Sequence, residues 1–134
     1  MENATATLQG GLAASEHEGK SISAKFEIDH GNVQLSVYTM KGDSFTEVVA
    51  DPTTGAVVKA EKITDAEDLK AAAAQKAAMA TAEVPLLAAT ETAVKNNAGF
   101  RAVSVYPELK GGQATAEVTL MQGTTFKKVT EKVD

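Results

Sequence analysis

One stretch of the chain recurs at a constant offset of 81 residues: residues 22–48 align with residues 103–129 without a gap. Apolar positions match apolar positions, and the turn residues match as well. Two unrelated β-rich stretches would share the apolar pattern but would rarely share the turns. The sequence therefore predicts two copies of one structural unit. The matched turn glycines are Gly31 with Gly112 and Gly42 with Gly123, and the phenylalanine three residues beyond the second turn also matches, Phe45 with Phe126.

Each copy has the pattern of a helix followed by an antiparallel meander. Thr7 can cap a helix over residues 8–18, and Pro85 and Gly99 can begin and end the helix of the second copy. Alternating apolar and polar residues, interrupted by glycine-containing turns, then predict consecutive strands. The predicted strands are residues 22–28, 33–38, 45–50 and 56–63 in the first copy, and residues 103–109, 113–121 and 125–133 in the second.

Residues 64–67 read Thr-Asp-Ala-Glu, which fits a helix capping box, and the sequence that follows is almost pure helix former. The expected fold is therefore α+β, with two tandem units of one helix and one antiparallel sheet. Residues 1–64 form the first unit, an Ala-rich connecting helix covers residues 65–82, and residues 83–134 form a shorter second unit without the final strand.

The order of these elements resembles the PepSY domain, a family found in propeptides of secreted metallopeptidases and in small exported bacterial proteins. The family has a hydrophobic strand, a polar turn, and an apolar pair followed by Asp-x-x-Thr-Gly. The match covers residues 7–63, and residues 84–134 less fully, because Lys132 stands where Asp51 does. The residues that carry it are residues 33–38, Gly42, Val48, Val49, Asp51 and Gly55.

The resemblance implies a helix packed on an antiparallel sheet, as in tandem-repeat inhibitors of secreted β-lactamases. It also implies export from the cytoplasm and the binding or inhibition of an extracytoplasmic enzyme. Residues 1–3 lack the basic and apolar parts of a signal peptide, which fits either an exported protein that has lost its signal or a cytoplasmic start. The resemblance favours export, so we expect a periplasmic or secreted protein.

Composition argues against several function classes. A net charge of −5 gives no basic footprint for phosphates, so we expect no nucleic-acid partner. The chain has no Cys that could serve as a thiolate nucleophile. No apolar run approaches the ~20 residues of a membrane span. The two histidines, His17 near a helix end and His30 in a turn, lie in separate contexts. We therefore expect no enzyme, no cofactor and no membrane span.

The solvent face of the sheet is the predicted binding surface. In the alternation of its strand, Tyr38 falls on the side opposite to the predicted core residues, and Tyr106 falls on the side opposite to its apolar neighbours. Aromatic side chains supply much of the energy of protein interfaces. Tyrosines that merely cover a sheet, with wet hydroxyls, would show the same pattern. The predicted partner-binding residues are Tyr38, Met40, Tyr106 and Met121, and the expected partner is a peptidase or another envelope protein.

Cation binding is the alternative function. Asp29, Asp43 and Asp51 fall at strand ends, and calcium or a lanthanide takes six or more oxygen ligands from such loops. The dense Asp-x-Asp-x-Asp-Gly arrangement of a dedicated calcium loop is missing. Turn capping by the carboxylates explains each aspartate equally well. A divalent or trivalent cation therefore stays the second hypothesis.

Overall fold

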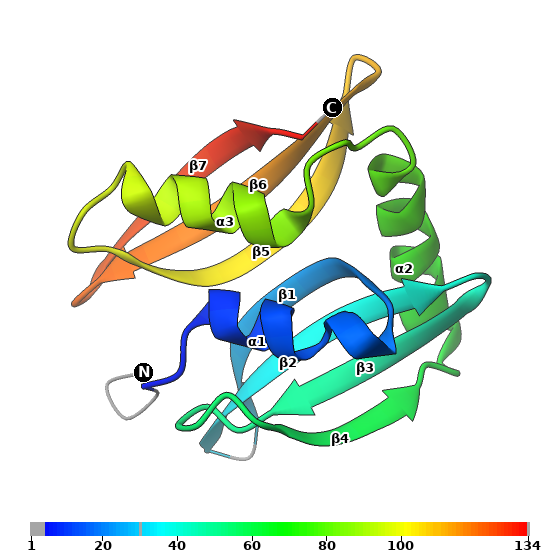
Figure 1. Cartoon of the computed structure of the whole chain (residues 1–134), viewed down its shortest axis with the longest axis horizontal. Coiled ribbons are helices and arrows are strands. Elements are labelled where there is room, and N and C mark those ends of the chain that lie inside the picture. The colour runs from blue at the N-terminus through cyan, green and yellow to red at the C-terminus, as the bar shows by residue number, and fades with distance from the viewer. Residues whose placement is uncertain (1–4, 30, 134) are drawn as a thin grey trace.

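The computed structural model describes residues 5–29 and 31–133. Within them the strands form one antiparallel sheet in the order β4-β3-β2-β1-β5-β6-β7 (Figure 1). The strands are β1 (Lys20–Asp29), β2 (Asn32–Lys41), β3 (Ser44–Ala50), β4 (Val57–Lys62), β5 (Arg101–Lys110), β6 (Gln113–Gln122) and β7 (Thr125–Lys132). The helices are α1 (Leu8–Ala14), a short 3-10 turn (Glu16–Glu18), α2 (Ala66–Met79) and α3 (Leu86–Lys95).

The prediction of two tandem helix-plus-sheet units is wrong. Strands β1 and β5 pair antiparallel, with Ala24 opposite Val105 and Lys25 opposite Ser104, so all seven strands belong to one continuous sheet. Separate units would each leave the edge of β1 or β5 without hydrogen-bond partners, and pairing the two edges satisfies both. The offset of 81 residues persists in the strand starts, since β1 begins at Lys20 and β5 at Arg101.

Helices α1 and α3 lie on the same face of the sheet, which we call the helix face (Figure 1). The large side chains of the core gather there because strand residues alternate between the two faces. Thr7 caps α1 by accepting a 2.9 Å hydrogen bond from the Gly10 N–H. The helix ends at Ala14, earlier than predicted. The fully buried core residues include Leu8, Leu12, Leu35, Val37, Val48, Leu86, Val105, Val118 and Leu120.

Helix α2 connects the first half of the sheet to the second and contacts β1, β5 and β6. Its N-cap is Asp65 rather than Thr64, because the Asp65 carboxylate accepts hydrogen bonds from two N–H groups of the first turn. Lys76 reaches the turn between β2 and β3, where its ammonium lies 3.1 Å from the Asp43 carboxylate. The buried residues of α2 are Ala72, Ala78 and Met79.

The second face of the sheet, here the open face, carries the residues that alternate with the buried core. Tyr38 follows the buried Val37 along β2, and Tyr106 follows Val105 along β5, so both tyrosines point to the open face. None of the helices in the described residues is long and apolar enough to cross a bilayer.

Candidate binding site between helix α2 and the sheet

Two tyrosines lie in one row across the open face. Tyr38 pairs with Ser23 of β1. Strand β1 pairs with β5 at Ala24 and Val105, and one further step of this antiparallel register brings Ser23 beside Tyr106. The short serine side chain therefore lies between two aromatic rings. A small residue flanked by two large ones leaves a hollow in the surface of the sheet.

Helix α2 closes the solvent side of this hollow. The helix presents mainly alanine methyl groups, which are too small to fill the space between it and the sheet. A cavity of about 260 Å³ remains, with Tyr38 and Tyr106 among the residues that line it. The other lining residues are Asp68, Ala71, Ala72 and Gln75 of α2, and Ser23, Ala24, Lys25, Ser104 and Val105 of the sheet.

Polar neighbours hold the Tyr38 ring in place. Its hydroxyl donates a 3.4 Å hydrogen bond to the carboxylate of Glu47, the residue opposite it on β3. The Lys25 ammonium lies 6.0 Å from the ring centroid, within reach of a cation–π interaction. Burial, reinforced by the nearby carboxylates of Glu47 and Glu27, raises the pKa of Tyr38 above its ordinary value. Tyr38 is therefore a neutral hydrogen-bond donor at physiological pH.

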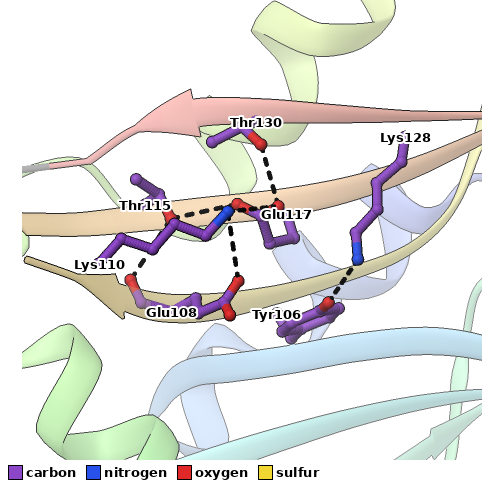
Figure 2. A network of polar contacts seen from close by, with 7 residues as sticks. All are labelled: Tyr106, Glu108, Lys110, Thr115, Glu117, Lys128 and Thr130. Carbon is purple, nitrogen blue, oxygen red and sulfur yellow. Dashed lines mark hydrogen bonds and ion pairs between the residues drawn. The ribbon is translucent and has the colours of Figure 1, made fainter.

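Tyr106, on the β5 side of the cavity, contacts Lys128 of β7 (Figure 2). The Lys128 ammonium donates a 2.7 Å hydrogen bond to the Tyr106 hydroxyl oxygen and lies 5.2 Å from the ring centroid. This hydrogen bond raises the pKa of Lys128, so the side chain stays charged. Both aromatic rings that line the cavity thus have fixed polar contacts before any ligand arrives.

A buried carboxylate continues the row beyond Tyr106. Glu117 lies opposite Tyr106 in the register and is only 3% exposed. Its oxygens accept hydrogen bonds from the Thr115 hydroxyl at 3.1 Å and the Thr130 hydroxyl at 2.9 Å, and the Lys110 ammonium is 3.5 Å away (Figure 2). These contacts replace the water that the carboxylate loses. The alternation along β6 indicates the face of Glu117 but gives no sign of its burial, so sequence reasoning missed this residue.

The two predicted methionines also lie on the open face, but neither of them lines the cavity. Met40 is near the end of β2 and is partly buried against the core. Met121 is near the end of β6, opposite Phe126, whose side chain is 65% exposed. Because β1 and β5 pair antiparallel around Ala24 and Val105, equivalent positions that lie far from this pair, such as Met40 and Met121, fall at opposite ends of the sheet. The structure therefore brings Tyr38 and Tyr106 together and leaves Met40 and Met121 apart.

Asp51, one of the predicted cation ligands, caps the turn between β3 and β4. One of its carboxylate oxygens accepts hydrogen bonds from the backbone N–H groups of Thr53 at 2.7 Å and Thr54 at 3.0 Å. The hydrogen bonds from Thr54 and Thr53 lower the pKa of Asp51. The carboxylate thus has a structural role that needs no cation.

The other predicted ligands do not join Asp51. Asp43 lies in the turn between β2 and β3, at the opposite end of these strands, and forms an ion pair with Lys76. The side chain of Asp29, and His30, lie outside the described residues. His17 Nε2 lies 3.0 Å from a carboxylate oxygen of the adjacent Glu18. Among the described residues, no group of three or more His, Asp or Glu side chains gathers in a way that could hold a metal ion.

Comparison with known proteins adds little to this geometry. No protein-family model matches the chain, and no curated protein matches it. Among solved structures, the chain is similar to a "putative lipoprotein" from Clostridium difficile 630, at 15% sequence identity and a TM-score of 0.45. The alignment covers 92% of this chain and 82% of that one.

Proposed function

We propose that this chain is a non-catalytic binding module that works outside the cytoplasm and holds a peptidase or another envelope protein by the open face of its sheet. The observation that carries the proposal is the convergence of Tyr38 and Tyr106, 68 positions apart in sequence, on one cavity under α2. The extracytoplasmic location rests on the resemblance to exported PepSY proteins.

The cavity has the size and chemistry of an anchor site. Pockets that enclose drug-sized ligands begin at about 300 Å³, so a volume of about 260 Å³ suits a single partner side chain. Two aromatic walls and a floor of small residues offer apolar contact, and Asp68 and Gln75 add polar groups at the helix side. Buried aromatic anchors of this kind dominate the free energy of many protein interfaces.

Preorganisation supports the same function. The rings of Tyr38 and Tyr106 already contact Glu47, Lys25 and Lys128, so little side-chain freedom is lost when a partner binds. Each immobilised side chain costs roughly 0.5–1.5 kcal/mol of binding free energy when it must be ordered during association. A rigid tyrosine pair avoids most of that cost.

The test is a comparison of variants against a partner captured from periplasmic extract, identified by mass spectrometry and then purified. Tyr38→Ala and Tyr106→Ala should each weaken binding about tenfold or more in calorimetric titration. Val58→Ala, which trims a side chain that is 61% exposed on β4, serves as the matched control and should leave the affinity unchanged. Equal affinity of the two tyrosine variants and the parent chain would contradict the proposed surface.

A further inference from the structure

We propose that the free edge of β7 accepts an extended acidic segment of a partner polypeptide, which adds to the sheet as an antiparallel strand. This site lies at one border of the sheet and does not require the cavity under α2, so the inference goes beyond the proposed function. The carrying observations are the regularity of β7, its charge, and the exposed aromatic side chain near its start.

The geometry of β7 suits strand addition. Among the residues that the structure describes it is the last strand of the sheet, so the backbone groups on its outer side have no neighbouring strand there. Its pairing with β6 runs from Thr125 to Lys132 without a register shift. The opposite edge strand, β4, is shorter and has a register shift against β3. A long, flat edge with unpaired N–H and C=O groups is a template for another strand.

The side chains of β7 define what kind of strand fits. On the open face the strand presents Phe126, Lys128, Thr130 and Lys132, in the order of the pleat. The side chain of Lys132 makes no hydrogen bond or ion pair with the residues that the structure describes, so its charge is available to a ligand. The basic edge belongs to a chain whose net charge is −5. An acidic segment therefore complements β7 locally.

The same charges disfavour a second copy as the occupant. Two β7 strands paired antiparallel around Lys128 would bring Lys128 of one copy directly against Lys128 of the other. The other edge strand, β4, also carries two lysines, Lys59 and Lys62, against one acidic residue, Glu61. Like charges directly opposite each other destabilise a strand pair. The lysines thus disfavour self-pairing around Lys128 and at the same time favour an acidic partner.

The register predicts the sequence pattern of the occupant. In an antiparallel pair, residues that face each other lie on the same side of the sheet. A strand running opposite to β7 would place an acidic residue against Lys132, a second acidic residue four positions later against Lys128, and an apolar residue two positions after that against Phe126. The matching heptapeptide is Glu-Thr-Val-Thr-Glu-Thr-Ile.

The test uses this heptapeptide with a fluorescent label and the full chain, with binding measured by anisotropy. The acidic peptide should bind saturably, and the same peptide with lysine in place of both glutamates should bind at least tenfold more weakly. Alternate backbone N–H groups of an extended peptide point to opposite edges, and only one edge faces β7. Methylation of the nitrogens on that edge should therefore abolish binding, and methylation of the nitrogens on the other edge should be tolerated. Hydrogen exchange of β7 amides should slow in the complex.

Charge reversal in the chain provides the matched comparison. Lys132→Glu should weaken binding of the acidic peptide about fivefold to tenfold, and a peptide with lysine at its first position should recover affinity for this variant. Lys59→Glu on β4 is the control and should change nothing. Binding that is absent, equal for both peptide charges, or equally blocked by both methylation patterns would overturn the inference.

The experiment also separates this site from the cavity. The Tyr38→Ala variant should bind the acidic peptide as the parent chain does, since Tyr38 lies on the far side of β1 from β7. Loss of peptide binding in that variant, without loss of folding by circular dichroism, would place the peptide in the cavity and contradict the edge-strand site. If the peptide does not bind β7, the edge-strand inference fails. The proposed function is then still tested separately, by the partner titration of the tyrosine variants.

Discussion

Gly11 of α1 lies directly against Leu35 of β2. A Cβ atom on Gly11 would come within 2.8 Å of Leu35 Cδ2, closer than two carbon atoms can pack. The absence of a side chain at this position therefore allows α1 to approach the sheet closely. Two adjacent glycines weaken an isolated helix, but one of them is explained by the packing of the helix face.

Gly11→Ala should destabilise the fold although alanine is the better helix former. The clash with the fully buried Leu35 is expected to cost up to about 3 kcal/mol, against a gain of about 1 kcal/mol from helix propensity. Urea unfolding of Gly11→Ala, Leu35→Val and the double variant measures the coupling. The double variant should be more stable than the sum of the single effects predicts, and simple additivity would contradict the packing argument.

Glu117→Ala should lower the free energy of unfolding by about 2 kcal/mol, because the buried Thr115 and the exposed Thr130 lose the Glu117 carboxylate as the acceptor of their hydroxyl hydrogen bonds. Glu117→Gln keeps one carbonyl oxygen and should lose less. The matched control is Glu108→Ala, which removes a partly exposed carboxylate of the same network. Denaturant unfolding decides the ranking, and equal effects of the two alanine variants would refute the role of Glu117.

The raised pKa of Tyr38 makes stability depend on pH in the alkaline range. The folded chain holds the Tyr38 proton more tightly than the unfolded chain, whose tyrosine has the ordinary pKa of 10.0. This contribution is complete below pH 10.0 and is lost as the pH rises above it. Thermal unfolding from about pH 9 to about pH 11 should show a smaller decline for Tyr38→Phe than for the parent. Tyr106→Phe is the control.

The lowered pKa of Asp51 has the opposite sign. The folded chain holds the carboxylate ionised through the Thr54 and Thr53 N–H groups, so the stabilisation is present above the ordinary pKa of 3.8 and is lost as the pH falls through the folded-state pKa. Asp51→Asn should flatten the fall of the melting temperature on acidification. The control is Asp43→Asn, which replaces an exposed carboxylate at the other end of the strands and should leave the fall of the melting temperature unchanged. Parallel curves for Asp51→Asn and the parent chain would argue against the turn contact.

The strands were predictable because each carries a local signal. Alternation of apolar and polar residues, with glycines at turns such as Gly42 and Gly123, locates β2, β3, β6 and β7 within a few residues. The pairing of β1 with β5 carries no such signal, because Ala24 and Val105 would be equally suited to two separate sheets. Sequence periodicity therefore could not predict the pairing of β1 with β5. Without that pairing it could not predict the single sheet either.

The candidate site was only partly predictable for the same reason. Alternation places Tyr38 and Tyr106 on the side away from the core, but the hollow between them depends on Ser23, which becomes their neighbour only through the β1–β5 join. The position of α2 was equally hidden. Its alanines give the helix almost no apolar face, so nothing in the sequence indicates that Ala71 and Ala72 roof a cavity.

The pairing of Ala24 with Val105 joins two residues that are 81 positions apart, so each faces its own counterpart in the other repeat. An approximate twofold axis thus passes through the middle of the sheet, with Lys25 and Tyr106 as mates around it. In an assembly of two identical subunits, any substitution near such an axis would appear twice. Because the two repeats belong to one chain, equivalent positions can carry different residues. One side of the cavity can therefore have an aromatic ring where the other has a cation, and each can be adjusted independently to an asymmetric ligand.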